Sequence, residues 1–282
     1  MAIKAKIYLF EGNWTQVKNI TSTIMTEGGF KLFGSYAGLF EIANEYNSEV
    51  ILDAQYRPTS REHQMMYVFL PPTLGGYSQL SPLQELVDSY IMLDGKTIKE
   101  TGTSFDESHP YANRDPRLKA TVMYTGNSYT LADGTEVVIN CEKGEGKDGY
   151  GVGSDCSATG YYIKKYWDNT YRATLYSGLN PILIRYADIL LMNAEALAEL
   201  GELDKTAWDA TIKPIRDRAG FTLASALEFP EGASKDKLIE IVRNERRSEL
   251  ALEGHRHKDI IRWRIADNVL NGWCHGLKTN DV

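Results

Sequence analysis

A chain of 282 residues is long enough to bury a substantial core, and 43% hydrophobic with 24% charged residues is an ordinary composition for a globular protein. The net charge of -7 argues against a nucleic-acid partner, which would need a clustered basic surface. No apolar run reaches the roughly 18 residues of a membrane-spanning helix, and the N-terminus has no hydrophobic secretory segment. The 17 tyrosines offer flat rings with a polar tip, a shape that suits the faces of sugars.

Two helices are expected in residues 1–29. Ile3, Ile7 and Phe10 are spaced for one face of a helix over residues 1–12, and a second amphipathic helix follows from Trp14 to the glycine pair at 28–29. The two form a helical hairpin that resembles a tetratricopeptide unit, and we expect it to serve packing rather than ligand binding.

Residues from about 45 to 180 read as an irregular loop layer with a small amount of sheet. The segment SEVILDAQY is expected to be extended, and Ser81 with Gln84 three residues on predicts a capping box. Strands are expected over 120–124 and 136–139, joined by a loop that contains Tyr129. Long irregular segments on a helical frame are where binding surfaces usually lie.

The three cysteines leave two readings open. Cys141 and Cys156 bracket a glycine-rich segment, and they could form a disulfide in an oxidising compartment or remain free thiols. Cys274 is left over in either case.

A second hairpin is expected over about 183–220. Its first helix places Leu190, Ala194 and Leu197 on an apolar face, opposite a polar stripe that includes Asp188 and Glu195. Its second helix contains Pro214, which predicts a bend or an early restart, and ends at Gly220, which predicts a left-handed C-cap.

The C-terminal helices are expected over 234–270, with Ser234 as an N-cap. Glu245, Glu249 and Glu253 recur every four residues beside aliphatic positions. A carboxylate pair at glycosidase spacing is one reading of this pattern. Arginines on the same and the preceding helix favour the other reading, a salt-bridged helix junction, because they would keep the carboxylates ionised when a general acid needs a raised pKa.

Several ordered motifs resemble the SusD/RagB family, the outer-membrane lipoproteins that capture nutrients, mostly glycans. The motifs are RYADILLMNAEALAELG, IRDRAGF and ERRSELALEGHRHKDIIRW, with SPLQELVDSYIMLDGKTI and NRDPRLKATVMYTG further upstream. The resemblance implies a mostly α fold in which tetratricopeptide-like hairpins form a scaffold under an irregular loop and small β layer. One departure is His257 and Lys258, where the family usually has aromatic residues after GHR.

The resemblance also implies one SusD-like domain over residues 1–282, truncated at its N-terminus because family members are longer. The chain lacks the cysteine near its start that the family uses as a lipid anchor, so membrane association is expected only through an anchor absent from this chain. The implied location is the surface of the outer membrane, and the implied partners are an oligosaccharide and a SusC-like TonB-dependent transporter.

We expect a non-catalytic protein that binds oligosaccharide or another nutrient and delivers it to that transporter. The candidate ligand-binding residues are ring-bearing side chains in the loop layer: Tyr77, Tyr111, Tyr129, Trp167 and Tyr171. The alternatives are a tetratricopeptide-type adaptor for other proteins and a glycoside hydrolase. No cofactor motif is present, and the spacing of His255, His257, Asp259 and Glu253 matches no standard metal site.

Overall fold

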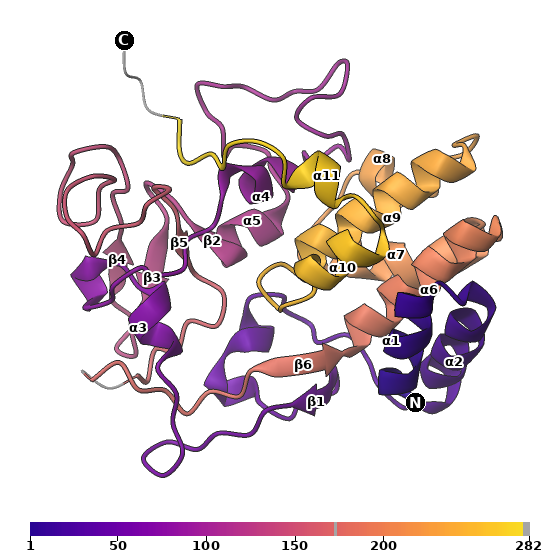
Figure 1. Cartoon of the computed structure of the whole chain (residues 1–282), viewed down its shortest axis with the longest axis horizontal. Coiled ribbons are helices and arrows are strands. Elements are labelled where there is room, and N and C mark those ends of the chain that lie inside the picture. Colours follow the sequence, from indigo (N-terminus) through magenta and orange to yellow (C-terminus); the bar gives the residue numbers. More distant parts are fainter. Residues whose placement is uncertain (172–173, 279–282) are drawn as a thin grey trace.

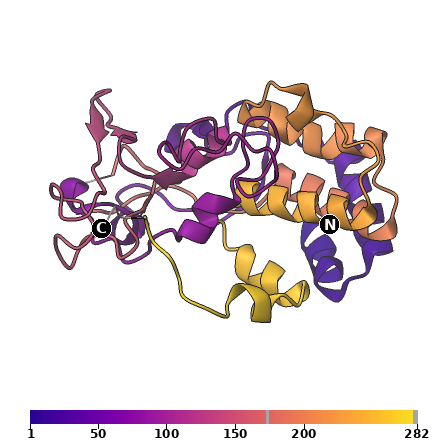
Figure 2. The ribbon, with the colours of Figure 1, turned by 90° about the horizontal axis from the view of Figure 1, so that it is seen from above.

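The computed structural model describes residues 1–171 and 174–278. Helices gather at one side of the molecule, and loops with short strands form the other side (Figure 1, Figure 2). The predicted fold class, mostly α with a small β layer, is confirmed. The helices are α1 (Ala2–Glu11), α2 (Trp14–Glu27), α3 (Met65–Phe69), α4 (Gln84–Ser89), α5 (Pro116–Thr121), α6 (Tyr186–Leu200), α7 (Lys205–Ala219), α8 (Ala224–Leu227), α9 (Lys235–Glu249), α10 (Arg256–Arg262) and α11 (Ala266–Val269).

Helix α6 is the centre of the helical side. It contacts α1, α2, α7 and α9, and every residue from Ala187 to Ala198 is buried. The alanines of this segment let neighbouring backbones approach closely, while its leucines fill the spaces between helices. The hairpins α1–α2 and α6–α7 therefore pack side by side through α2 and α6, although residues 28–185 separate them along the chain.

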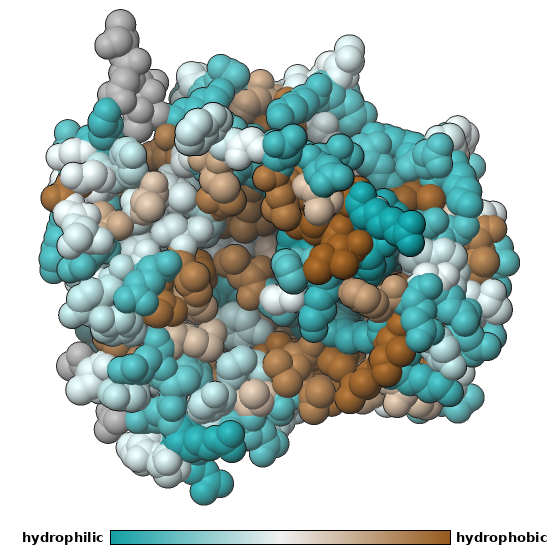
Figure 3. Space-filling view, in the orientation of Figure 1, coloured by the Kyte–Doolittle hydropathy of each residue, from teal (hydrophilic) through white to brown (hydrophobic). Residues whose placement is uncertain are grey.

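The structure corrects the predicted faces of two helices. In α1 the buried residues are Ala2, Ala5 and Leu9, whereas Ile3, Ile7 and Phe10 are more than half exposed. Small side chains face α2 and α6 because the helices lie close together, and apolar groups reach the surface over α1 and α10 (Figure 3). In α6 the expected polar stripe is largely buried, because Asp188 and Glu195 are taken up in ion pairs.

Helix ends follow the local sequence closely. Gly201 and Gly220 are left-handed C-caps, as predicted for Gly220, and Ser234 caps α9 by accepting from the Lys237 amide at 3.2 Å. Helix α7 is continuous through Pro214, without the restart that was expected there. The predicted capping box is wrong, because α4 begins at Gln84, after Ser81 and beyond its reach as an N-cap.

Three antiparallel two-stranded sheets lie in the loop layer and at its border with α6. The pairs are β1 (Val50–Asp53) with β6 (Ile182–Arg185), β2 (Val122–Met123) with β5 (Tyr162–Ile163), and β3 (Ser128–Thr130) with β4 (Glu136–Val138). The extended segment around β1 is confirmed. Strands lie within both expected ranges, as β2 and β4, but the segment between them is not all loop, because Tyr129 lies on β3, which pairs with β4.

Cys141, Cys156 and Cys274 are free thiols, which resolves the two readings left open for the first two. Cys141 is buried, and Cys156 Sγ lies 3.3 Å from the carbonyl oxygen of Lys147. Within residues 1–171 and 174–278, no helix has both the length and the apolar character to span a bilayer.

Candidate functional site

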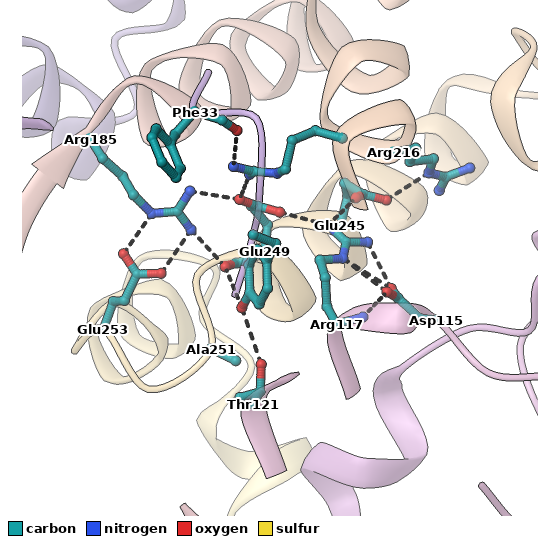
Figure 4. Close-up of polar contacts among 12 residues, drawn as sticks. Phe33, Asp115, Arg117, Thr121, Arg185, Arg216, Glu245, Glu249, Ala251 and Glu253 are labelled. Carbon is teal, nitrogen blue, oxygen red and sulfur yellow. Dashed lines mark hydrogen bonds and ion pairs between the residues drawn. The ribbon is translucent and has the colours of Figure 1, made fainter. Parts of the chain in front are cut away.

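A buried network of ion pairs joins the helical side to the loop layer (Figure 4). Arg117, at the start of α5, pairs with Glu245 Oε1 at 2.7 Å and Glu249 Oε2 at 2.9 Å. Arg185, at the end of β6, pairs with Glu249 Oε1 at 2.6 Å and Glu253 Oε1 at 2.8 Å. Segments that are far apart in the sequence are therefore held together by charge.

The network is electrically balanced within the part of the chain that the structure describes. Five carboxylates, Glu49, Asp115, Glu245, Glu249 and Glu253, meet five cations, Lys165, Arg117, Arg185, Arg216 and Arg218. Balance matters because an unmatched buried charge costs several kcal/mol. Nearly all of these side chains are almost inaccessible to solvent.

Three carboxylates of this network, Glu245, Glu249 and Glu253, stay ionised. Burial alone would raise the pKa of Glu249, but Arg218, Arg185 and Arg117 hold it well below its usual range. Burial alone would also raise the pKa of Glu253, but Arg185 and Lys165 lower it to about 2. Arg117 and Arg216 lower the pKa of Glu245 against the same burial. None of these three carboxyl groups is placed to donate a proton at neutral pH. The three glutamates therefore form a salt-bridged helix junction and not the acid–base pair of a glycosidase.

Three of the predicted ring residues gather with Tyr67 in the loop layer. Trp167 lies 5.3 Å from Tyr171 between ring centres, and both pack against the same apolar cluster. The Trp167 indole donates to the Thr130 carbonyl at 2.8 Å, and the Tyr171 hydroxyl donates to the Leu74 carbonyl at 3.0 Å. Tyr77, 40% exposed, stacks on Tyr67 at 4.2 Å. These hydrogen bonds and stacks fix the orientation of the rings.

The other two predicted residues are placed differently. Tyr129 is fully buried and donates to the Ile163 carbonyl at 2.7 Å, so its ring supports Trp167, 5.0 Å away, and has no face open to a ligand. This corrects its role, because a β3 side chain turned inward becomes core. Tyr111 lies in a separate cluster, stacked on Tyr124 at 3.9 Å, with its hydroxyl 3.3 Å from that of Tyr161.

A groove that the sequence did not reveal runs along the outer face of α9. It has a volume of about 810 Å³ and is bordered by α10, by the α7–α8 region and by the segment that follows α4. Four arginines line it: Arg243, Arg247 and Arg256, and also Arg216, which pairs with Glu245 at 2.7 Å. In the sequence, arginine recurs at 243 and 247, one helical turn apart. This pattern favoured ion pairs and gave no indication of a groove.

The residues around His255, whose spacing matches no standard metal site, serve other roles. Glu253 pairs with Arg185 and Lys165, and Asp259 pairs with Arg246 and Arg262. Burial lowers the pKa of His255 to about 4, which keeps it neutral at pH 7. Outside positions 172–173 and 279–282, no group of three or more His, Cys, Asp or Glu side chains is arranged to hold a metal ion.

Proteins that are similar to this chain in sequence and in fold include SusD-like proteins. SusD-like protein P25 of Formosa agariphila is 28% identical, and the match covers 95% of this chain and 50% of that protein. A SusD-like carbohydrate binding protein of Bacteroides fragilis superposes with a TM-score of 0.84 at 30% identity, covering 96% of this chain and 53% of its own. A second SusD-like protein of that organism gives 0.80 at 27% identity, covering 99% and 56%.

The chain thus spans about half the length of the relatives it matches. The family model described as the SusD family matches residues 38–280, which takes in the loop layer, the ion-pair network and α6 to α11. The chain belongs to the SusD family.

Proposed function

We propose that this protein binds oligosaccharide without cleaving it, and that it delivers the sugar to a SusC-like TonB-dependent transporter at the surface of the outer membrane. Membership of the SusD family supports the proposal, as does similarity to a Bacteroides fragilis structure described as a carbohydrate binding protein.

The observation that carries the proposal is the anchored ring surface, which we define as Tyr67, Tyr77, Trp167 and Tyr171. Sugar rings stack their C–H faces on aromatic side chains, and rings that are already held in place lose little conformational entropy on binding. Trp167 and Tyr171 are each fixed by a hydrogen bond to a backbone carbonyl, and Tyr77 leaves one face of its ring open while the other stacks on Tyr67.

Affinity electrophoresis in gels that contain individual polysaccharides tests the ring surface. Tyr77→Ala and Tyr171→Ala should abolish the retardation of the wild-type protein while circular dichroism remains unchanged. Trp273→Ala is the matched control, because Trp273 is 89% exposed and lies outside the ring surface. Undiminished retardation of both tyrosine variants would reject this choice of residues, and no retardation of the wild-type protein across a broad panel would reject sugar binding.

Delivery needs a separate test. The immobilised protein should capture a detergent-solubilised SusC-like transporter encoded beside it, and failure to do so would remove the hand-over step but leave sugar binding intact. The hydrolase alternative is disfavoured because the side chains of Glu245, Glu249 and Glu253 are almost inaccessible to solvent and ionised. The adaptor alternative predicts capture of other proteins in place of glycans, which the same two assays distinguish.

A further inference from the structure

The groove along α9 contains positive charge that the protein does not neutralise. Arg247 lies in the last turn of α9, and Arg256 is the first residue of α10; both side chains line the groove and are half-buried. Within residues 1–171 and 174–278, neither guanidinium forms an ion pair with a carboxylate. Arg247 donates to the backbone carbonyl of Glu85 at 2.6 Å, and Arg256 lies over the ring of Trp263 at 5.7 Å.

This lack of partners contrasts with the buried arginines of the network. Arg117, Arg185 and Arg218 each pair with at least two carboxylates. Burial, followed by the neighbouring charge of Arg256, lowers the pKa of Arg247 to about 10, and burial also lowers the pKa of Arg256. The charges of Glu85 and Asp88 partly offset this effect for Arg247, as Asp259 does for Arg256, and an anion beside the two guanidiniums would offset the remaining cost of burial.

A third guanidinium lies at the same end of the groove. Arg243 is 4.8 Å from the centre of the Trp263 ring that Arg256 also covers, and it pairs with Glu199 at 3.0 Å. Its Nε is buried without a hydrogen-bond partner. The ring of Trp263 thus holds two arginines close together, which favours recognition of an oxyanion by several donors.

Five of the six acidic residues that line the groove are already engaged, and the sixth, Asp236, lies in the first turn of α9, about three helical turns before Arg247. Glu199 pairs with Arg243, and Glu228 pairs with Lys213 at 3.1 Å. Glu240 pairs with Lys237, about two helical turns before Arg247. Asp94 and Glu100 accept backbone N–H groups of Lys96 and Thr97, respectively.

Helix polarity alone does not explain both arginines. A cation in the last turn of α9, such as Arg247, is favoured by the helix dipole, but a cation in the first turn of α10, such as Arg256, is not. A ligand that brings negative charge accounts for both positions.

We propose that the arginine groove, defined by Arg243, Arg247 and Arg256, binds a carboxylate or sulfate group on an acidic sugar. The proposal rests on the proposed function, because it assumes that the ligand is an oligosaccharide. Planar guanidiniums match the geometry of both oxyanions, and a groove of about 810 Å³ has the volume of an ordinary small-molecule site.

Isothermal titration calorimetry with three oligosaccharides of matched length tests this proposal. The probes are an oligogalacturonate, which carries carboxylates, a sulfated galactan fragment and a neutral galactan fragment. We expect at least one acidic probe to bind at least about tenfold more tightly than the neutral one, and this preference should fall as NaCl is raised. Which acidic probe binds distinguishes a carboxylate from a sulfate.

Variants assign the preference to the groove. Arg247→Gln and Arg256→Gln should each weaken binding of the acidic probe about tenfold and leave the neutral probe unaffected. Arg57→Gln removes the same charge from an exposed arginine outside the groove and should change neither. Equal binding of acidic and neutral probes, or a preference that survives in the Arg247→Gln/Arg256→Gln double variant, would overturn the proposal. Absence of binding by all three probes would overturn the proposal, whereas the proposed function is tested separately by retardation across the broad polysaccharide panel.

Discussion

Replacement of Glu249 by glutamine should destabilise the protein strongly. Its side chain is fully buried and accepts from Arg117 at 2.9 Å, from Arg185 at 2.6 Å and from Arg218. Glutamine keeps the size but removes the charge, which leaves five cations facing four carboxylates in a region without solvent. Breaking a buried pair in this way costs about 3–5 kcal/mol, a large fraction of the roughly 5–15 kcal/mol by which a domain is stable.

Urea unfolding at 25 °C, followed by far-ultraviolet circular dichroism, measures this cost. The control is Glu240→Gln on the same helix, where the carboxylate is 62% exposed and pairs with Lys237. That variant should lose less than about 0.5 kcal/mol, as expected for a surface pair. A loss below about 1 kcal/mol for Glu249→Gln would refute the reasoning that the network holds the fold.

The same network sets the acid limit of stability. The cationic partners of Glu249 and Glu253 lower the pKa of both carboxyl groups, that of Glu253 to about 2. The contribution of these two groups to the free energy of unfolding is therefore complete above the usual glutamate pKa near 4.5 and is lost as pH falls toward 2. The free energy of unfolding should therefore fall steeply below about pH 4.5. Glu249→Gln should show a shallower fall, and an unchanged slope in that variant would contradict the assignment.

Three further outcomes are expected. Iodoacetamide at pH 8 should modify exposed Cys274 within minutes and leave Cys141 unmodified until urea is added, because burial raises the pKa of the Cys141 thiol to about 12. Peptide mass spectrometry locates the adducts, and rapid modification of Cys141 would contradict this. Gly76→Ala should lower the free energy of unfolding by about 1–3 kcal/mol and weaken glycan retention, because the added Cβ would lie 2.1 Å from the Leu70 carbonyl oxygen, beside Tyr77. Gly34→Ala is the control, since its Cβ would meet nothing within 4 Å, and it should be neutral in a thermal melt. The imidazole of His255 should remain neutral down to about pH 4 in a ¹⁵N NMR titration, and protonation near pH 6.5 would show that it is not buried as described.

Much of the helical side could be predicted from the sequence, because helix signals are local. Ser234, Gly201 and Gly220 end or begin helices where their conformational preferences require it. The faces of those helices were less predictable. Asp188 reads as a surface residue on α6, yet it is buried against Arg246, 58 positions away, and no local pattern carries that information.

The candidate site was predictable only in part. Trp167, Tyr171 and Tyr77 were selected as rings in loops, and they do lie in one layer. Tyr129 was selected on the same grounds but is core, because strand pairing turns its side chain inward. The arginine groove was missed because the sequence shows arginines near carboxylates without showing which of them pair.

If a neutral ion-pair frame holds the fold while the anchored rings bind sugar without cleaving it, a bound oligosaccharide should leave the protein intact. The direct test is to incubate the protein with a fluorescently labelled oligosaccharide that it retains, and to analyse the recovered label by capillary electrophoresis. All label should return at its original length. Shorter products that disappear in a folded Glu249→Gln variant would contradict it.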